Sequence, residues 1–569
     1  FLFFFFLIIW DFSIVCLSLQ KKFIRFLNLT MYEQVGYRFL AENIDDDSPI
    51  KNRTDFVIDL RPIATIEKNE NHRIDVPFSV VEFYRNQTIL ITGVTGFVGK
   101  VLLEKFLRLS TIHKIYVLLR PKWGKNPKER LQELFKNSQA FNFYPLDFTK
   151  VQTIDGDLTK TDLGISLEDQ QRLANEVNLV FHCAASVQFK GNLKIFIEQN
   201  VLGTDHIMKL CSKMIRLKVV IYVSTAYANC NLSYVEEKVY PIDFGSNIDE
   251  YIKKILWKYG DTCPKANDAA LCGRPNCYTF SKAIAETLIV EKYPNLPVSI
   301  CRPSIVTHAV QEPARGWCDT KNGVSGALIL GGLGIARTML LNLDCRADVI
   351  PVDFLANAMI VMASYNVSMP PFLRKKVIHL TSGQTNPITW GQMLEYGRKA
   401  IVDKPFLKQI RPLASLPQRT DSYFGLFNHY CTKIFSHYCF ALLVDLIVFI
   451  CGHQPFLMKI TKQMHRGFDT LQPFTNREWF FRYENYRDIF NSLSEHDQQI
   501  FPSDISKIDW YDYIDGATLG TRRYMMKEDD SSIEQAIRRQ KLLNRSFGIG
   551  EAILSFIIFS IIWWTIMVD

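Results

Sequence analysis

The sequence lacks a regular spacing of cysteines. Its 13 cysteines are odd in number and scattered without a repeated spacing, which fits reduced thiols in the cytosol better than a disulfide framework. Cys263, Cys272 and Cys277 form one loose group, but zinc sites prefer gaps of about two or four residues with a fourth ligand nearby. We therefore predict that the protein has no metal site.

The chain also lacks a strong excess of charge. Lys and Arg total 66 against 58 Asp and Glu, a formal net charge of +8, and the two signs are interleaved rather than gathered in a basic stripe. We therefore predict no nucleic-acid partner. A hydrophobic content of 48% and 23 prolines spread along the chain exclude a disordered or collagen-like protein. At 569 residues, two folded domains are expected.

The first 77 residues form a lead-in to the folded part. They open on an apolar run, Phe1–Trp10, and the first methionine is Met31. We expect residues 1–30 to be upstream sequence translated ahead of the true start, with a signal anchor as the alternative. Residues 31–77 are polar and acidic, which predicts a loosely ordered segment.

Residues 78–355 alternate between apolar strand-like runs and helical periods. The apolar runs are 89–91, 115–119, 179–182, 219–223 and 298–301. This rhythm predicts an α/β fold with a Rossmann-like, doubly wound parallel sheet. Residues 356–529 are rich in aromatic residues and helical patterns, and we expect a second, mostly helical domain there. Within it, the run 438–451 is interrupted by Asp445, which predicts a core helix, with a membrane-dipping helix as the alternative.

The C-terminal run 552–568 contains no charged residue. Its length borders on the ~17–25 residues that a helix needs to span a bilayer. Four basic residues precede it, and Asp569 alone follows it; the four are Arg538, Arg539, Lys541 and Arg545. Because positive flanks remain in the cytosol, we predict a transmembrane tail anchor at 547–569 with the folded domains facing the cytosol.

A glycine-rich turn, Thr92–Gly99, lies between an apolar run at 88–91 and a helical pattern at 100–108. A strand, a glycine turn and a helix start place backbone N–H groups against a pyrophosphate, although such a turn alone can be only a tight connection. The next strand ends at Arg120, where a cation suits a 2′-phosphate. The pattern predicts NADPH, with turn contacts from Thr92, Gly93, Thr95, Gly96, Phe97, Val98 and Gly99.

Tyr278 and Lys282 lie four residues apart at the start of a helical stretch, which places both side chains on one face. A phenol has a pKa near ~10, and a neighbouring ammonium favours phenolate. Tyr278 could then pass a proton to a carbonyl oxygen as a hydride arrives. The same spacing is common on helix surfaces, but behind a dinucleotide turn it predicts a catalytic pair.

Two further strand ends carry hydroxyl or small side chains. Ser224 and Thr225 follow an apolar run at the carboxyl edge of the predicted sheet, where doubly wound sheets bind ligands. A hydroxyl there can donate to the same carbonyl oxygen, or it can satisfy a turn. Another strand ends at His182, for which we expect packing or hydrogen bonding rather than catalysis. Small residues follow it and would let the backbone approach a cofactor: Cys183, Ala184 and Ala185.

In this order, the motifs resemble those of the extended short-chain dehydrogenase/reductases, and more narrowly those of the fatty acyl-CoA reductases. The resemblance covers about residues 78–568, and the helical part matches around 510–524. The matching segments are 92–105, 118–122, 156–157, 180–186, 200–204, 223–229, 278–282, 301–306 and 347–353. The chain departs from the family at Val94 and at 315–318, and we expect the second departure to alter the shape of an acyl pocket.

The resemblance implies NADPH-dependent reduction of a long-chain fatty acyl-CoA to a primary alcohol, with release of CoA. It implies that Tyr278 donates the proton, that Lys282 tunes Tyr278 and holds the nicotinamide ribose, and that Thr225 or its neighbour Ser224 holds the carbonyl oxygen. Arg120 would bind the 2′-phosphate. Further implied cofactor contacts are Asp157, Leu158, Cys183, Ala184, Ala185, Asn200, Arg302, Pro303 and Ile305.

The same motifs are also compatible with other functions. A membrane-bound sterol dehydrogenase or a sugar-nucleotide epimerase would share the cofactor half, but neither explains the matches in the helical part. A non-catalytic NADPH-binding scaffold would not need Tyr278 and Lys282, and no cysteine lies in a motif for a covalent acyl intermediate. The sequence leaves a homo-oligomer open. Because it ends in Met-Val-Asp569, without a peroxisomal tripeptide, we expect the endoplasmic reticulum membrane, with the peroxisome as the alternative.

Overall fold

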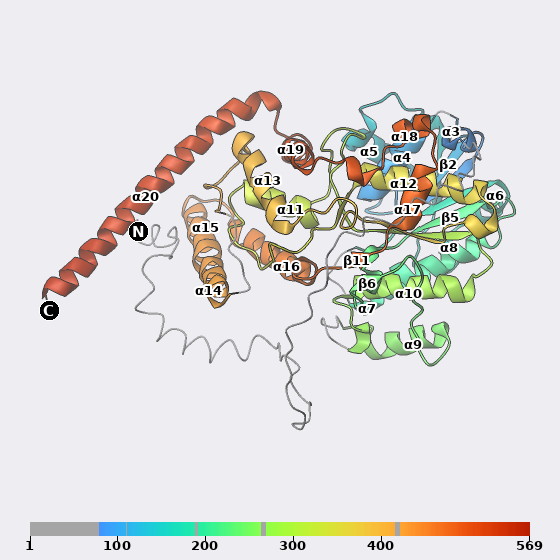
Figure 1. Cartoon of the computed structure of the whole chain (residues 1–569), viewed down its shortest axis with the longest axis horizontal. Coiled ribbons are helices and arrows are strands. Elements are labelled where there is room, and N and C mark those ends of the chain that lie inside the picture. Colours follow the sequence, from blue (N-terminus) through green and yellow to red (C-terminus); the bar gives the residue numbers. More distant parts are fainter. Residues whose placement is uncertain (1–78, 110, 188–191, 263–268, 416–421, 569) are drawn as a thin grey trace, which may run out of the picture. The chain divides into compact units, whose positions relative to one another are not determined.

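The computed structural model describes residues 79–568 except 110, 188–191, 263–268 and 416–421. Its main sheet has seven parallel strands in the order β10-β7-β5-β4-β1-β2-β3 (Figure 1). They are β1 (Thr88–Thr92), β2 (Lys114–Leu119), β3 (Val151–Asp155), β4 (Leu179–His182), β5 (Val219–Val223), β7 (Val298–Pro303) and β10 (Val377–Leu380). Two short sheets pair β6 (Tyr234–Val235) with β11 (Phe480–Phe481), and β8 (Ile305–Thr307) with β9 (Val349–Pro351). The expectations for residues 1–77 and for Cys263 lie outside the described residues.

The order of the strands places a ligand crevice beside β1. The chain first builds β2 and β3 on one side of β1, and then β4, β5, β7 and β10 on the other. In doubly wound sheets, ligands bind at the carboxyl ends of the strands where the direction of winding reverses. Here that point lies between β1 and β4, so the predicted Rossmann-like sheet is confirmed.

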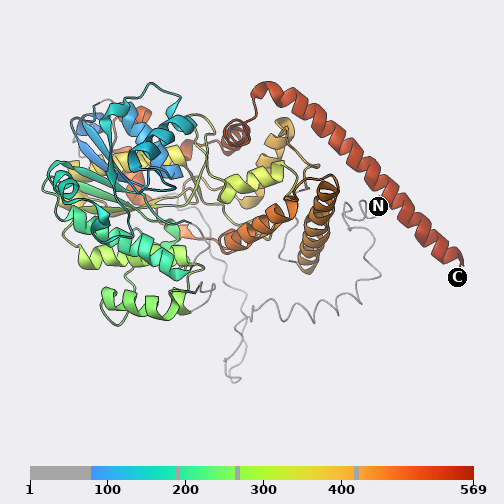
Figure 2. The ribbon, with the colours of Figure 1, turned by 180° about the vertical axis from the view of Figure 1, so that it is seen from behind.

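Helices cover both faces of this sheet, as Figures 1 and 2 show from opposite sides. Ile89 and Ile91 of β1 enter one hydrophobic core and Leu90 enters the other, because successive strand residues point to opposite faces. The first core includes α4 (Phe97–Arg108), α12 (Val352–Ser368) and α17 (Glu484–Asn491). The second includes α6 (Leu167–Glu176), α8 (Gly203–Cys211) and α10 (Cys277–Lys292).

The sheet extends beyond residue 355, where the sequence places the end of the Rossmann domain. Strand β10 pairs with β7, so the sheet ends at Leu380. Helices α17 and α18 (Glu495–Ile500) also return to this part of the fold, because Tyr486 and Ile500 pack in or against the first core. The limits 78–355 and 356–529 therefore remain predictions, and the packed sheet layer draws on both ranges.

The predicted helical part is built from helices that lie beside the sheet layer (Figure 1). They are α13 (Trp390–Asp403), α14 (Tyr423–Cys431), η8 (Thr432–Cys439), α15 (Phe440–Ile450), α16 (Leu457–Thr475), α19 (Trp510–Gly520) and η10 (Thr521–Met526). Helix α11 (Gly323–Gly332), from the range predicted for the Rossmann domain, packs with them. A separate hydrophobic cluster joins α15 and α16 to Ile335. The remaining longer helices are α5 (Pro127–Asn137) and α9 (Ile248–Tyr259).

Helix α20 (Ile533–Val568) contains the predicted tail anchor. Large apolar side chains along it are exposed, including Phe556, Phe559 and Trp564. Among the residues searched for membrane spans, the helix 423–450 is the one long and apolar enough to cross a bilayer, with a mean hydropathy of 1.8, and a third of its most apolar window is buried. It contains all but the last residue of the run 438–451, which the sequence assigns to a core helix.

Candidate active site

The glycine turn after β1 brings the backbone of two strands and a helix into close approach. Gly93 has a φ of +81°, and a Cβ at this position would lie 2.7 Å from the backbone nitrogen of Ala184. A Cβ on Gly99 would lie 2.2 Å from the carbonyl oxygen of Gly93. Glycine is therefore required at both positions. Thr95 and Gly96 are exposed at the N-terminal end of α4, where free backbone N–H groups can hold a pyrophosphate.

Arg120 and Asp157 meet at the ends of β2 and β3. Their side chains form an ion pair with an N–O distance of 3.5 Å, and Arg120 keeps 46% of its side chain exposed. Asp157 also accepts hydrogen bonds from the backbone and the hydroxyl of Thr159. The guanidinium of Arg130, in α5, donates to the carbonyl of Arg120. Sequence reasoning missed Arg130, which adds a second cation at this corner of the crevice.

A chain of hydrogen bonds fixes the end of β4 against β1. The Thr92 hydroxyl lies 2.7 Å from His182 Nδ1 and accepts the N–H of Ala184. His182 Nε2 lies 3.2 Å from the Thr204 hydroxyl, which itself donates to the carbonyl of Asn200. The histidine is therefore a neutral donor at Nε2 and acceptor at Nδ1. Burial lowers its pKa to about 3, so the structure gives it the hydrogen-bonding role that we expected.

Helix α10 presents Tyr278 to Thr225 at the carboxyl edge of β5. The Thr225 hydroxyl forms a side-chain hydrogen bond with Tyr278 and also accepts the N–H of Tyr227 at 3.3 Å. Burial raises the pKa of Tyr278 to about 12, and the bond with Thr225 lowers it only in part. From the sequence we expected a pKa lowered by Lys282. In the structure burial raises it instead, which keeps the phenol protonated at neutral pH.

Lys282 lies one helical turn beyond Tyr278 and is almost completely buried. Its ammonium donates to the carbonyl of Val223 at 2.6 Å and lies 4.7 Å from the centre of the Tyr222 ring. Burial lowers the pKa of Lys282 to about 8, although the carboxylate of Glu286 acts in the opposite direction. The side chain is thus held at the end of β5, beside the predicted nicotinamide position.

Two of the residues implied as cofactor contacts, Asn200 and Arg302, form a hydrogen bond and an ion pair with side chains of α10. The Asn200 amide donates to the hydroxyl of Ser281 at 2.9 Å and to the carbonyl of Ser186 at 3.1 Å. The Arg302 guanidinium is fully buried and pairs with Glu286 at 2.6 Å. A direct cofactor contact for Asn200 or Arg302 stays a prediction, and the structure shows that both hold the helix that carries Tyr278.

Ser224 places a free hydroxyl next to the Thr225–Tyr278 pair. Its side chain is buried, and its Oγ has no hydrogen-bond partner among the described residues. Buried hydroxyls in native proteins are nearly always hydrogen-bonded. An unpaired hydroxyl at the carboxyl edge of β5 therefore fits a polar group supplied by a bound molecule.

An apolar cavity of about 210 Å³ opens beside this edge. Ile305, Thr307 and His308 line it on the side of the sheet. Phe474 lines it from α16 and packs edge-on against Tyr227, with ring centres 5.0 Å apart. Helices α11, α13 and α19 supply the other walls, through Leu328, Gly331, Met393, Gly397, Ile514 and Ala517. Sequence reasoning expected an acyl pocket but had no signal for these residues.

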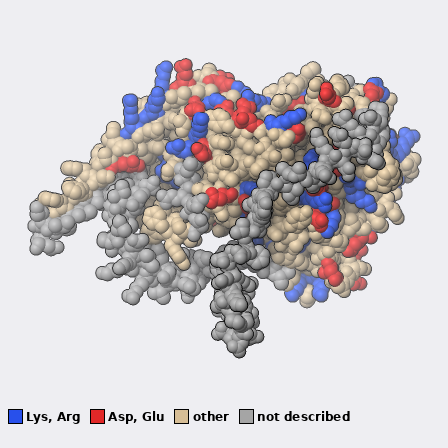
Figure 3. Space-filling model, viewed as in Figure 1, with Lys and Arg blue, Asp and Glu red and all other residues tan. Residues whose placement is uncertain are grey.

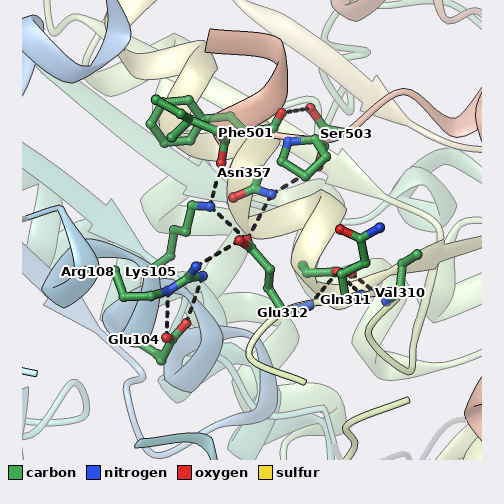
Figure 4. Close-up of polar contacts among 12 residues, drawn as sticks. Glu104, Lys105, Arg108, Val310, Gln311, Glu312, Asn357, Phe501 and Ser503 are labelled. Carbon is green, nitrogen blue, oxygen red and sulfur yellow. Dashed lines mark hydrogen bonds and ion pairs between the residues drawn. The ribbon is translucent and has the colours of Figure 1, made fainter. Parts of the chain in front are cut away.

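The loop 308–319 contacts both helix α4 and the helical part of the chain. Figure 4 shows the Glu312 carboxylate between Lys105 and Arg108, at 2.7 and 2.8 Å. Burial would raise the pKa of Glu312, but these two cations hold it at about 2. Asp353 accepts three backbone N–H groups of the same loop, from 310–312.

The segment 315–318, at which we expected a departure from the family pattern, packs against both α4 and α19. Trp317 stacks on Phe97 of α4 with ring centres 5.6 Å apart. Gly316 lies so close to α19 that a Cβ on Gly520 would be 1.8 Å from the Gly316 carbonyl oxygen. Arg315 lines a second cavity, of about 420 Å³, and not the apolar one. The expected effect on the acyl pocket is therefore not a direct contact.

Comparison with known proteins places the chain in a family. Two family models, both described as male sterility protein, match residues 91–359 and 436–528. Fatty acyl-CoA reductase 1 of Xenopus laevis is 36% identical over 480 residues, which is 83% of this chain and 91% of that protein. The chain belongs to the fatty acyl-CoA reductase family. Fatty acyl-CoA reductase 2 of Mus musculus is 34% identical and covers 85% of this chain and 92% of its own length.

Solved structures agree with the fold of this family member. The terminal reductase domain of the myxalamid pathway has a TM-score of 0.50 at 21% identity, and covers 78% of this chain and 93% of its own. A reductase domain of a non-ribosomal peptide synthetase from Mycobacterium tuberculosis has a TM-score of 0.51 at 18% identity, with coverages of 79% and 95%. At these identities the likeness concerns the fold alone.

Proposed function

We propose that the protein reduces a long-chain fatty acyl-CoA to the primary alcohol and releases CoA. Family membership supports an alcohol-forming oxidoreductase that uses a nicotinamide cofactor. The observation that carries the proposal is the hydrogen bond between Tyr278 and Thr225, at the carboxyl edge of the sheet and beside an apolar cavity.

The residues at this edge fit a dinucleotide. Gly93 and Gly99 leave room for a close backbone approach, and the start of α4 offers N–H groups to a pyrophosphate. When bound, the nicotinamide supplies hydride to the thioester carbonyl carbon and then to the aldehyde. We assign the ribose to Lys282, whose ammonium lies at the end of β5, and the remaining predicted contacts keep their roles as proposals.

Tyr278 is proposed to donate the proton to the substrate oxygen in each reduction. A pKa of about 12 keeps the phenol protonated, so a proton is available without prior ionisation. Thr225, already hydrogen-bonded to Tyr278, and Ser224, with its free hydroxyl, would hold the same oxygen. A general acid positioned in this way contributes roughly 10²–10⁴-fold to the rate.

A covalent acyl-cysteine route is less consistent with the site. Cys183 is the cysteine in the segment that follows β4, and burial raises its pKa to about 12. The thiolate, and not the thiol, is the nucleophile. At neutral pH Cys183 is therefore a poor attacking group, which favours direct hydride transfer.

We further propose NADPH rather than NADH as the cofactor. Arg120 is partly exposed at the end of β2, with Arg130 behind it, and a phosphate prefers charge-assisted contacts with guanidinium groups. Asp157 would release part of its ion pair with Arg120 when the 2′-phosphate binds.

The acyl chain is proposed to occupy the apolar cavity. The cavity begins at Ile305, two residues after the end of β7, and runs between α11 and the helices α13, α16 and α19.

Helix α20 is proposed to anchor the protein in a membrane. Removal of residues 547–569 should therefore release the protein from carbonate-washed membranes. Retention would assign the anchor to another segment. The endoplasmic reticulum remains the favoured membrane.

The reaction is tested with the purified full chain, NADPH and palmitoyl-CoA. We expect free CoA and hexadecanol, with two NADPH oxidised for each CoA released. A sterol dehydrogenase would oxidise or reduce a sterol and leave palmitoyl-CoA intact. A non-catalytic scaffold would bind NADPH and release no CoA.

A further inference from the structure

The hairpin formed by residues 423–475 has one buried and one exposed apolar face. Its first arm is a continuous helix, 423–450, made of α14, η8 and α15, and its second arm is α16. Phe440, Ala441 and Leu443 of the first arm pack against Leu457 and Met464 of the second. The core-helix expectation for 438–451 therefore holds for one side of the helix only.

The other side of the first arm carries large apolar side chains in solvent. Phe435, Leu442, Leu446 and Phe449 are all exposed, with Leu442 at 63% and Phe449 at 66%. Their spacings of seven, four and three residues place them on one face of a helix. A continuous apolar face of this kind marks an interaction site rather than an ordinary protein surface.

The single acidic residue of the first arm does not reach this face. Asp445 is buried and accepts the backbone N–H groups of Phe456, Leu457 and Met458, each at 2.8 Å. These N–H groups belong to the start of α16, where a carboxylate is favourable. The acid that interrupts the apolar run in the sequence is thus used to close the hairpin.

The second arm carries a basic stripe. Lys459, Lys462 and Arg466 are exposed and recur at spacings of three and four residues, with Asp469 as the one acid of α16. Figure 3 shows the two signs of charge mixed over the visible face. A hairpin that has an apolar face and exposed lysine and arginine combines the features of helices that lie in a membrane interface and contact anionic head groups.

The hairpin also forms part of the wall of the apolar cavity. Ala336 and Phe468 line the cavity and pack against the hydrophobic cluster of the hairpin. Leu413 and Ser415 line the cavity as well, and helix α14 begins at Tyr423, eight residues after Ser415. The second arm of the hairpin therefore lines the cavity, and the first arm, which packs on it, carries the exposed face.

We propose that the hairpin lies in one leaflet of a lipid bilayer, with its apolar face among the acyl chains and its basic stripe at anionic head groups. An acyl-CoA dissolved in that leaflet would deliver its chain to the cavity beside the hairpin, a step that rests on the proposed function. A second copy of the chain is the less favoured occupant, because like-charged stripes would meet across a symmetric interface. The face that packs on α16 favours this position in one leaflet over a span of the bilayer.

The test places the full chain in nanodiscs of phosphatidylcholine and phosphatidylserine that contain a lipid with a photoactivatable diazirine in its acyl chain. We expect adducts on Phe435, Leu442, Leu446 and Phe449 after proteolysis and mass spectrometry. Trp257 and Phe372 are 88% and 82% exposed and should stay unlabelled. Adducts confined to α20, or equal labelling of the two control residues, would overturn the proposal. Labelling of α20 reports separately on the anchor.

A pair of variants then tests substrate delivery. Leu446→Glu/Phe449→Glu should raise the KM for palmitoyl-CoA in vesicles by roughly tenfold, because two inserted side chains become charged. The kcat and the KM for NADPH should not change, and neither should the KM for hexanoyl-CoA in solution. The matched control, Trp257→Glu/Phe372→Glu, should behave as the wild type. An unchanged KM in vesicles, or loss of a dimer from gel filtration of the Leu446/Phe449 variant, would refute a lipid partner. Loss of CoA release from every substrate would instead contradict the proposed function.

Discussion

Gly397 offers a way to shorten the apolar cavity without disturbing the fold. It lies in α13 and lines the cavity, and an added Cβ would meet Leu328 at 3.8 Å and Ile514 at 3.9 Å, which are ordinary contacts. Gly397→Ala should therefore fold normally, with a helix stabilised by up to about 1 kcal/mol. Gly397→Leu adds three further carbon atoms that have to enter the space proposed for the acyl chain.

The size of the effect follows from the methylenes displaced. A leucine at this wall takes the place of about three CH₂ groups of any bound chain that reaches it, and each buried CH₂ is worth about 0.8 kcal/mol. The loss is about 2.4 kcal/mol, or roughly 60-fold in kcat/KM. An acyl chain too short to reach Gly397 should lose nothing, so the preference of the enzyme should move towards shorter substrates.

The assay is a competition among saturated acyl-CoAs of increasing length, with the alcohols separated by gas chromatography. The control is Gly467→Leu, in the adjacent helix α16, where a Cβ would meet no atom within 4 Å. It should leave the product profile unchanged. An equal loss at every chain length in a protein with normal thermal stability, or no change at all, would show that the acyl chain does not occupy this cavity.

Three predictions concern the reacting groups and the cofactor. Tyr278→Phe should lower kcat roughly 10²–10⁴-fold while the Kd for NADPH, measured by fluorescence titration, stays within a few fold; near-normal turnover would remove Tyr278 from the mechanism. Arg120→Ala should weaken NADPH binding roughly tenfold and NADH binding little, since a hydrogen bond to a charged group is worth about 1.5 kcal/mol; an equal loss for both would move the phosphate contact elsewhere. Because the pKa of Lys282 is about 8, its ammonium is lost as the pH rises through that value, and kcat/KM for NADPH should fall above about pH 8, whereas Lys282→Arg should remove this fall. A flat profile up to about pH 9.5 would refute the role of the ammonium.

The strands of the sheet could be predicted from the sequence where they are apolar and are followed by a motif. β1, β2, β4, β5 and β7 coincide with predicted runs. Only Val151 and Ile154 of strand β3 are buried, because the strand lies at the edge of the sheet, so it carries no continuous apolar run. Strand β10 is short and lies beyond the expected domain boundary, and only its pairing with β7 reveals that it belongs to the sheet.

The candidate site was predictable where function depends on residue type and local spacing. The glycine turn and the Tyr278–Lys282 pair are of this kind. The cavity was not predictable, because its walls come from helices separated by up to 200 residues of sequence and its lining residues look like any apolar core. Arg130 was missed for a related reason: its tie to Arg120 crosses from a helix to a strand end.

The positions of Asn200 and Arg302 show that a motif residue can also hold the helix that carries the predicted proton donor. A catalytic phenol is useful only when it is held within hydrogen-bond reach of the reacting atom. Asn200 holds α10 through Ser281, and Arg302 holds it through Glu286, one turn beyond Lys282. A buried ion pair adds little to stability compared with apolar residues of the same size, so the value of Arg302–Glu286 lies in fixing the orientation of α10. Because the same helix begins beside Thr225, the two braces and the reacting hydroxyl groups form one rigid unit, and substitutions behind the site should act on kcat through the geometry of Tyr278.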